Sequence, residues 1–478
     1  GVYGGLGYTQ SVFIFVRSGS GNSPWVLQQE LTDPNTVSDD QFGHTVSISS
    51  NGMYVIVGAK YDDVSGNSNS GAAHIFIRSG SGNTPWSHQQ ELIDPNASGG
   101  DNFGRSVDIS SDGVYAIIGA SNEAAHIFTR SGNGSNPWSH QQKLVDPNTV
   151  ANDQFGISVA ISGNGMYAIV GAEQDGGSYR GRAHVFNRHG DLWTHQQEIS
   201  DPNSGINEYF GRSVSISTDG VYVVIGCPLD GSGASVWMGS AHVYARSRTS
   251  WAYKQKIVDP NVNSQDKFGS SVTISGNETD GLYIISGSPF DDGGGSNAGA
   301  AHIFHINPLS LGTRISTLEI FDVDTVHNLA SNVARISALE SGGGTNPGDV
   351  TRITNLETSN TAIWSNLASN VVRIEELETS NTAIWSNLAS NVTRIEELES
   401  AIGFIYGPIV HQQELLDPNA NAGDYFGISI DISSDGMYAI VGAYGDDNGG
   451  NRAGAAHIFV RSGSGSNPWV YQDELLDP

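Results

Sequence analysis

The sequence predicts an all-β propeller of about seven four-stranded blades that is interrupted by a long α-helical coiled-coil segment. Three observations carry this prediction. The 478 residues include 60 glycines, 16 prolines and only 15% charged residues, a composition typical of a turn-rich β protein. A β-rich unit containing a Phe-Gly pair recurs along the chain. One long segment between two such units has a seven-residue periodicity instead of the two-residue alternation of strands.

Each repeated unit has the same order of segments. After the Phe-Gly pair, an alternating run such as 45–49 leads to an Asn-Gly or Asp-Gly dipeptide, which is a strong hairpin signal, and then to a second run such as 54–59. A third run follows a loop rich in Gly, Asp and Ser, and a fourth starts with Trp and ends with Asp-Pro-Asn. Four short antiparallel strands per unit predict a propeller blade. The pairs begin at Phe42, Phe103, Phe155, Phe210, Phe268 and Phe426.

Glycine and aromatic residues recur at fixed places in the unit. The glycines of the Phe-Gly and Gly-Ala pairs are expected to mark close backbone approach near a crowded axis. The phenylalanine and tryptophan side chains are expected to fill the space between neighbouring blades. A solenoid and a string of sandwiches are the alternative all-β architectures, but their units are usually shorter and longer, respectively.

These repeats resemble the FG-GAP repeat, the unit of the integrin α-subunit head propeller and of many bacterial and viral surface proteins. Phe42, Gly43, Gly58 and Ala59 occupy the naming positions, and the likeness extends over residues 1–304 and 411–478. The proline of the name is mostly absent. The Asp-x-Asp-x-Asp-Gly calcium loop of many family members is reduced to bare turns such as 49–52, so that metal site is not carried over.

Residues 305–410 are expected to form a coiled-coil insertion or stalk, with helices at about 311–341 and 350–402. Two 21-residue copies, 356–376 and 377–397, differ at one position and place Leu, Ile and a recurring Asn at the a and d heptad positions. The recurring Asn at the a and d positions and the mixture of Ile and Leu there favour self-association as a trimer. Two arrangements stay open: residues 411–478 either complete one ring or open a second propeller. Such a segment resembles the coiled coils of phage and viral fibres.

The charge balance makes nucleic acid a poor partner, because a formal net charge of −28 repels phosphate backbones. No apolar run approaches the ~20 residues of a membrane span, so membrane insertion is not expected.

Paired aspartates in the loop before the third strand are the candidate metal ligands. Oxygen-rich, flexible loops suit calcium, although a solvated turn would have the same composition. A histidine recurs at one register of each third strand and is interpreted as a structural part of the unit. The calcium candidates are Asp62, Asp63, Asp291, Asp292, Asp446 and Asp447.

The sequence favours a structural or adhesive surface protein without enzymatic activity. It contains no nucleophile elbow, phosphate loop or zinc-protease motif, and nearly identical units argue against a single active site. A fibre, spike or appendage component is expected, located outside the cell or on a virion surface and able to contact a cell-surface glycan or protein. The alternative is a calcium-dependent adhesion module that binds glycan or protein. An enzyme such as a lyase or glycosidase is the third hypothesis.

Overall fold

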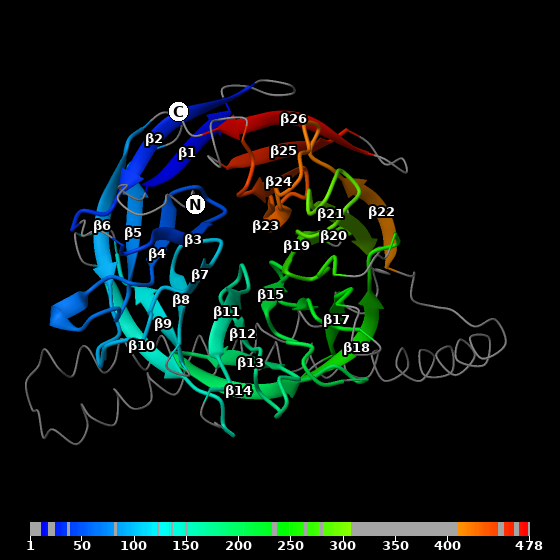
Figure 1. Cartoon of the computed structure of the whole chain (residues 1–478). Coiled ribbons are helices and arrows are strands. Elements are labelled where there is room, and N and C mark those ends of the chain that lie inside the picture. The colour runs from blue at the N-terminus through cyan, green and yellow to red at the C-terminus, as the bar shows by residue number, and fades with distance from the viewer. Residues whose placement is uncertain are drawn as a thin grey trace, which may run out of the picture. The chain divides into compact units, whose positions relative to one another are not determined.

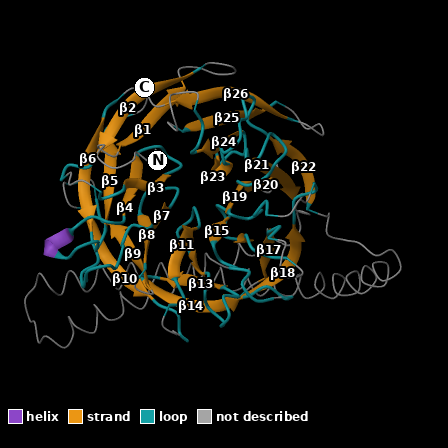
Figure 2. Ribbon diagram, viewed as in Figure 1, coloured by secondary structure: helices purple, strands orange, loops and turns teal. Residues whose placement is uncertain are grey.

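The computed structural model describes residues 11–306 and 409–476 of the chain. Within these ranges, short gaps fall at 18–23, 36–38, 81–83, 122–123, 133, 135–136, 149–151, 204, 232–236, 248, 262–264, 278–280, 448–453 and 463–467. The described residues form strands, turns and one 3-10 segment, Val64–Gly66 (Figure 2). None of the described residues belongs to a helix long and apolar enough to cross a membrane.

Six four-stranded antiparallel sheets follow one another along the chain. The first blade contains β3 (Phe42–Ile48), β4 (Tyr54–Ala59), β5 (Ala72–Arg78) and β6 (Trp86–Leu92), and the second β7 (Ser106–Ile109), β8 (Tyr115–Ala120), β9 (Ala124–Arg130) and β10 (Trp138–Leu144). The third contains β11 (Phe155–Ile161), β12 (Tyr167–Ala172), β13 (Arg182–His189) and β14 (Leu192–Ile199), and the fourth β15 (Ser213–Ile216), β16 (Tyr222–Cys227), β17 (Ser240–Ser247) and β18 (Ser250–Ile257). The fifth contains β19 (Ser271–Asn277), β20 (Gly281–Ser288), β21 (Ala300–Ile306) and β22 (Val410–Leu415), and the sixth β23 (Phe426–Ile432), β24 (Tyr438–Ala443), β25 (Ala455–Arg461) and β26 (Trp469–Leu476).

The blades form a ring in which the first strand of each blade lies nearest the axis and the fourth lies outermost (Figure 1). A two-stranded sheet of β1 (Ser11–Arg17) and β2 (Trp25–Thr32) stands between the sixth blade and the first. Gln29 of β2 bonds the backbone of Trp86 in the first blade, and the backbone N–H of Trp25 donates to Asp473 in the sixth. Residues far apart in sequence therefore close the ring.

The predicted fold class is wrong in two respects. The described residues form six four-stranded blades, not about seven, because β1 and β2 supply only the third and fourth strands of a blade. They also contain no α-helix. The coiled-coil helices predicted at about 311–341 and 350–402 lie outside the described residues. The chain resumes at β22, which pairs with β21 and completes the fifth blade, so residues 409–476 continue the same ring.

Glycines allow the inner strands to pack backbone against backbone, as the sequence predicted. A Cβ atom on Gly119 would lie 2.1 Å from the carbonyl oxygen of Gly156 in the next blade. Gly156 itself has a φ of +96°, which glycine adopts without strain. The same contact joins Gly58 to Gly104. The Phe-Gly phenylalanines are buried beside these contacts; Phe103, Phe155, Phe210, Phe268 and Phe426 are all 0% exposed.

The outer strands are joined by a reciprocal pair of hydrogen bonds at each junction between consecutive blades. Between the first and second blades, the side-chain amide of Gln90 donates to the carbonyl of Trp138, and the N–H of Trp138 donates back to Gln90. Equivalent pairs join Gln29 to Trp86, Gln142 to Trp193, Gln197 to Trp251, Gln255 to Ile409 and Gln413 to Trp469.

The junction between β26 and β2 differs, and we call it the seam. Asp473 stands where the other junctions have Gln, so it accepts the N–H of Trp25 at 3.0 Å but has no amide with which to donate back. The indole N–H of Trp25 makes no hydrogen bond with the described residues, although it is buried. As at other junctions, an arginine also crosses the seam: Arg17 donates to the hydroxyl of Tyr438 and lies over its ring.

Replacing Gly119 by Ala should destabilise the ring by about 1–3 kcal/mol, because the new methyl group meets the backbone of the next blade and cannot be accommodated by rotating a side chain. Urea unfolding would measure the change. Gly134→Ala is the matched control, since a Cβ there meets nothing within 4 Å. Equal stabilities of the two variants would contradict this account of the glycine contacts.

Replacing Asp473 by Gln should stabilise the protein by about 1 kcal/mol, because the new amide can donate to the carbonyl of Trp25 and complete the reciprocal pair. Thermal unfolding would show a raised Tm. The reverse change, Gln413→Asp, should lower the Tm by removing the return bond to Trp469. The interpretation fails if the two substitutions shift the Tm in the same direction.

Candidate functional site

One end of the ring gathers the loops in which the blades differ from one another. In each blade the Phe-Gly pair and the end of the second strand lie at the same end of an antiparallel hairpin, as the pairing of Phe155 with Ala172 shows. The Asn-Gly or Asp-Gly turn lies at the opposite end. Residues that follow Phe-Gly or Gly-Ala therefore surround the axis at one end of the ring, which we call the axial face.

Five basic side chains from four blades lie on the axial face and form a basic cluster. Its members are His44, Lys60, Arg105, Arg212 and Lys267. Nζ of Lys60 lies 3.3 Å from Nε2 of His44. Burial and the nearby charges of Lys60 and Arg105 lower the pKa of His44 to about 4. The like charges therefore act on one another across blades.

The pKa values of two lysines in the cluster are lowered as well. Burial and the charges of Arg105 and Arg212 lower the pKa of Lys60 to about 8. Burial and the charge of Arg212 also lower the pKa of Lys267. Glu173 offsets part of this positive charge, because both of its carboxylate oxygens lie 3.0 Å from Nη1 of Arg212. Lys60, Arg105, Arg212 and Lys267 therefore gather positive charge at one site, beside His44, whose lowered pKa keeps it neutral near pH 7.

Aromatic side chains accompany the basic cluster. Tyr179 stacks on Tyr209 with ring centroids 5.6 Å apart, and Tyr425 stacks on Tyr444 at 4.9 Å. Nζ of Lys267 lies 4.0 Å from the centre of a phenylalanine ring in the same blade. Tyr179 and Tyr444 are 46% and 51% exposed, so the axial face offers aromatic surface to a ligand.

The backbone that carries several of these side chains is held in an unusual conformation. The residue before each Phe has a positive φ, which is 58° at Tyr209, 55° at Lys267 and 54° at Tyr425. Non-glycine residues adopt this region at a cost and are enriched at functional sites. Each blade thus projects the residue before its Phe-Gly pair from a loop of one fixed shape.

A second arrangement of side chains recurs once per blade, and we call it the blade cluster. It joins the buried His of the third strand to the Asp of an Asp-Pro pair in the preceding sheet. In five blades a further acidic side chain follows the second strand. The groups are Asp33, Asp62 and His74; Asp94 and His126; Asp146, Asp175 and His184; Asp201, Asp230 and His242; Asp259, Asp291 and His302; and Asp417, Asp446 and His457.

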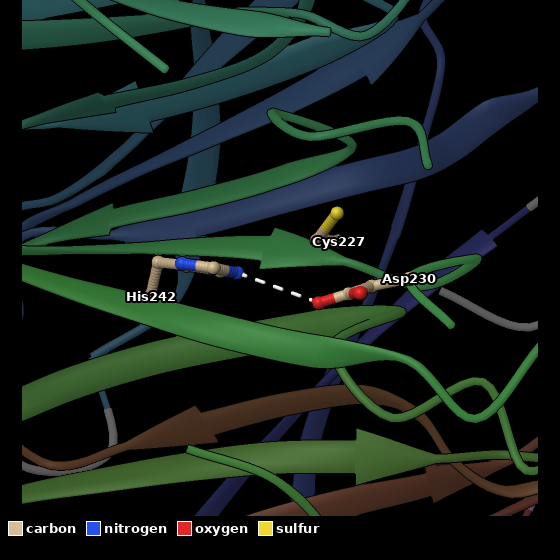
Figure 3. A group of neighbouring side chains, drawn as sticks. All are labelled: Cys227, Asp230 and His242. Atoms are coloured by element: carbon tan, nitrogen blue, oxygen red, sulfur yellow. Dashed lines mark ion pairs between the residues drawn. The ribbon is translucent and has the colours of Figure 1, made fainter. Parts of the chain in front are cut away.

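The fourth blade cluster also contains the single cysteine (Figure 3). Nε2 of His242 lies 3.7 Å from the carboxylate of Asp230, while Cys227 lies beside them with its thiol donating to a backbone carbonyl. Burial raises the pKa of the Cys227 thiol well above its ordinary value. Cys227 is therefore a neutral, buried small side chain, at the register where β4, β8, β12 and β24 end with alanine.

The six calcium candidates divide into two groups. Asp62, Asp291 and Asp446 are buried and join blade clusters. Their neighbours Asp63, Asp292 and Asp447 are exposed. Two of these brace their own loop, because Asp63 accepts the N–H of Asn69 at 2.7 Å and Asp292 accepts that of Asn297 at 2.8 Å. The structure does not bring the two aspartates of a pair together around one point.

Sequence reasoning missed two features of these sites. The partner of each buried histidine comes from the preceding sheet, so no short spacing reveals it. The signal was nevertheless present, because Asp-Pro and the third-strand His each recur once per unit. The basic cluster gave no local signal, because its five members are scattered over four units. Only closure of the ring brings them together.

The repeated four-stranded unit matches a known protein family. A family model described as the FG-GAP repeat matches residues 25–76, 86–135, 138–186, 193–244, 251–304 and 409–459. The chain belongs to the FG-GAP repeat family. No curated protein matches it significantly.

Solved structures with a similar fold include two proteins that are named as gluconolactonases. The periplasmic gluconolactonase PpgL of Pseudomonas aeruginosa has a TM-score of 0.52 and 9% identity, with 99% of this chain and 93% of that chain covered. A proposed 6-phosphogluconolactonase from Bacteroides uniformis has a TM-score of 0.51 and 9% identity, with 95% and 89% covered. At this identity the likeness shows the fold alone.

The prediction that the chain is not an enzyme is corrected at the level of the fold, because proteins named as gluconolactonases have the same fold, and a propeller of this kind is therefore no argument against an enzyme. The prediction depended on near-identity of the blades, which fails at the axial face. The residues after the six Phe-Gly pairs are His44, Arg105, Ile157, Arg212, Ser270 and Ile428.

The second blade gives a prediction about pH. Burial lowers the pKa of His126 to about 4, although the carboxylate of Asp94 acts in the opposite direction. Unfolded chains take up this proton near the ordinary pKa of 6.5, so the stability that comes from keeping His126 neutral is present above pH 6.5. It is lost as the pH falls towards 4, by up to about 3 kcal/mol.

Replacing His126 by Gln should therefore flatten the decline in stability between pH 7 and pH 4. Urea unfolding at several pH values would measure it, with His189→Gln at an exposed position of β13 as the control. If both variants keep the full decline of the parent protein, His126 is not a source of acid sensitivity.

Proposed function

We propose that this FG-GAP propeller is a surface-displayed adhesion protein whose axial face binds an anionic carbohydrate. The observation that carries the proposal is the basic cluster, five basic side chains converging at one end of a ring whose chain has a net charge of −28. Facing like charges destabilise one another unless an anion lies between them. A ligand bearing carboxylate or sulfate groups would relieve that repulsion.

The other side chains of the axial face suit such a ligand. Arginine recognises carboxylate and sulfate oxygens with charge-assisted, often paired, hydrogen bonds. The stacked tyrosines, Tyr179 with Tyr209 and Tyr425 with Tyr444, present flat apolar surfaces against which the C–H face of a sugar ring can pack. A small number of oriented polar groups beside aromatic surface is typical of ligand sites.

The proposed location is the cell exterior or a virion surface, where the protein would be part of a fibre, spike or appendage. The support is the FG-GAP resemblance, since many bacterial and viral surface proteins carry this repeat. A cell-surface glycan is the proposed partner. The basic cluster contains none of the six paired aspartates, so this binding does not require calcium, and calcium-dependent adhesion stays a separate prediction.

Removing charge from the basic cluster should weaken binding without harming the fold. Lys60→Gln and Arg105→Gln should each lower affinity for uronate-containing or sulfated oligosaccharides about tenfold, the loss expected for one charge-assisted contact. A glycan array followed by calorimetry would measure this. Lys254→Gln, an equal charge change on the exposed outer strand β18, is the matched control. Both cluster variants should remain at least as stable as the parent, because they relieve repulsion.

Several outcomes would overturn the proposal. Equal binding of neutral and anionic glycans would remove the role of the basic cluster, as would affinity that does not fall with added salt. Preference for a single-stranded oligonucleotide over every glycan would replace carbohydrate by nucleic acid. Hydrolysis of gluconolactone that is abolished by Arg105→Gln would make the axial face a catalytic site instead.

A further inference from the structure

We propose that the blade clusters of the first, fifth and sixth blades each bind a first-row divalent metal ion of the zinc class. In each, the ligands would be Nε2 of the third-strand histidine and one oxygen from each of two aspartates. The three sets are Asp33, Asp62 and His74; Asp259, Asp291 and His302; and Asp417, Asp446 and His457.

The spacing of the ligand atoms fits a metal site. Within each set the candidate ligand atoms lie within 4.8 Å of one another. Nε2 of His74 lies 3.7 Å from Asp33 and 3.6 Å from Asp62, and Nε2 of His457 lies 3.4 Å from Asp446. Tetrahedral zinc with bonds of about 2.0–2.1 Å separates its ligand atoms by about 3.4 Å. The observed distances are too long for strong hydrogen bonds but match the edges of such a polyhedron.

The histidines themselves point to a ligand. His74, His302 and His457 are 0% exposed, and Nε2 of each makes no hydrogen bond with the described residues. A buried ring nitrogen aimed at two carboxylates at such distances is costly for the folded protein unless something lies between them. A metal ion at this point would bind the nitrogen and both carboxylates at once.

The fourth-strand residue that pairs with each cluster histidine is a lysine in some blades and a glutamate in others. His242 in the fourth blade pairs with Lys256, whose Nζ lies 2.5 Å from Asp230. The chain thus supplies its own cation there. In the three proposed metal blades the same register is occupied by a glutamate: His74 pairs with Glu91, His302 with Glu414 and His457 with Glu474.

The two remaining blades follow the same rule. In the third blade His184 also pairs with a glutamate, Glu198, but Arg182 contacts both Glu198 and Asp175 and compensates their charge. Arg182 replaces the alanine or serine of the other blades. In the second blade His126 pairs with Lys143, and no aspartate stands between β8 and β9. In the three blades proposed to bind metal, the histidine opposes a glutamate, and the third strand begins with alanine in place of Arg182.

The donor set favours a transition metal over calcium. Calcium takes six to eight oxygen ligands, whereas imidazole nitrogen suits zinc and its neighbours. Each buried set supplies one nitrogen and two carboxylates, which are three of the four ligands that tetrahedral zinc takes. Asn35 donates to Glu91, and Asn261 donates to Glu414, which holds these glutamates beside the clusters.

Metal content of the full chain tests the inference. After dialysis against Zn²⁺ and removal of excess metal, elemental analysis should find three zinc ions per chain, and EDTA should lower the Tm by several degrees. Glu91→Lys should reduce the count to two, because its ammonium group would take the place that Lys256 occupies in the fourth blade. Glu198→Lys makes the same substitution at the same register of a blade proposed to lack metal, and it should leave the count at three.

The result that would overturn the proposal is a chain that binds no zinc. Three zinc ions retained in Glu91→Lys would also overturn it. If Glu91→Lys does not fold, Asp62→Asn removes a ligand without adding charge and should lower the count from three to two. Calcium binding in place of zinc, at the same sites, would reject the metal class.

Discussion

The contact between glycine backbones of neighbouring blades is the constraint on which the rest of the ring depends. Gly119 meets Gly156, and Gly226 meets the carbonyl of Gly269, at distances that exclude any side chain. Serine hydroxyls complete these contacts, as Ser106 donates to Gly156 and Ser213 to Gly269 at 2.9 Å. This spacing brings the inner strands close enough for the buried phenylalanines to fill the wedge between blades. The outer Trp and Gln pairs can then meet.

Repetition and variation are separated in space. The contacts that build the ring recur in nearly every blade, because each junction poses the same packing problem. Variation is concentrated on the axial face, where His44, Arg105 and Arg212 occupy positions that are isoleucine or serine in other blades. A ligand site on such a scaffold needs no change in the blades themselves.

The parts of this structure that depend on local sequence could be predicted, and those that depend on ring closure could not. Asn164 and Gly165 specified a hairpin, and the Trp-led runs specified outer strands, because turn chemistry and alternation act over a few residues. The number of complete blades depended on whether residues 11–32 supplied two strands or four. The meeting of Lys60 with Arg212, and of Asp417 with His457, required the angle between blades, which no local pattern encodes.

The seam has a mechanical consequence for a protein of this shape. A closed ring under tension carries the same load through every junction, so it opens at the one with the lowest resistance. The junction of Trp25 with Asp473 lacks the return hydrogen bond found at the six Gln junctions. Force applied across the ring would therefore separate β26 from β2 first and leave the six four-stranded blades joined as an arc. The opening of the seam would release extension and so absorb work before any blade unfolds.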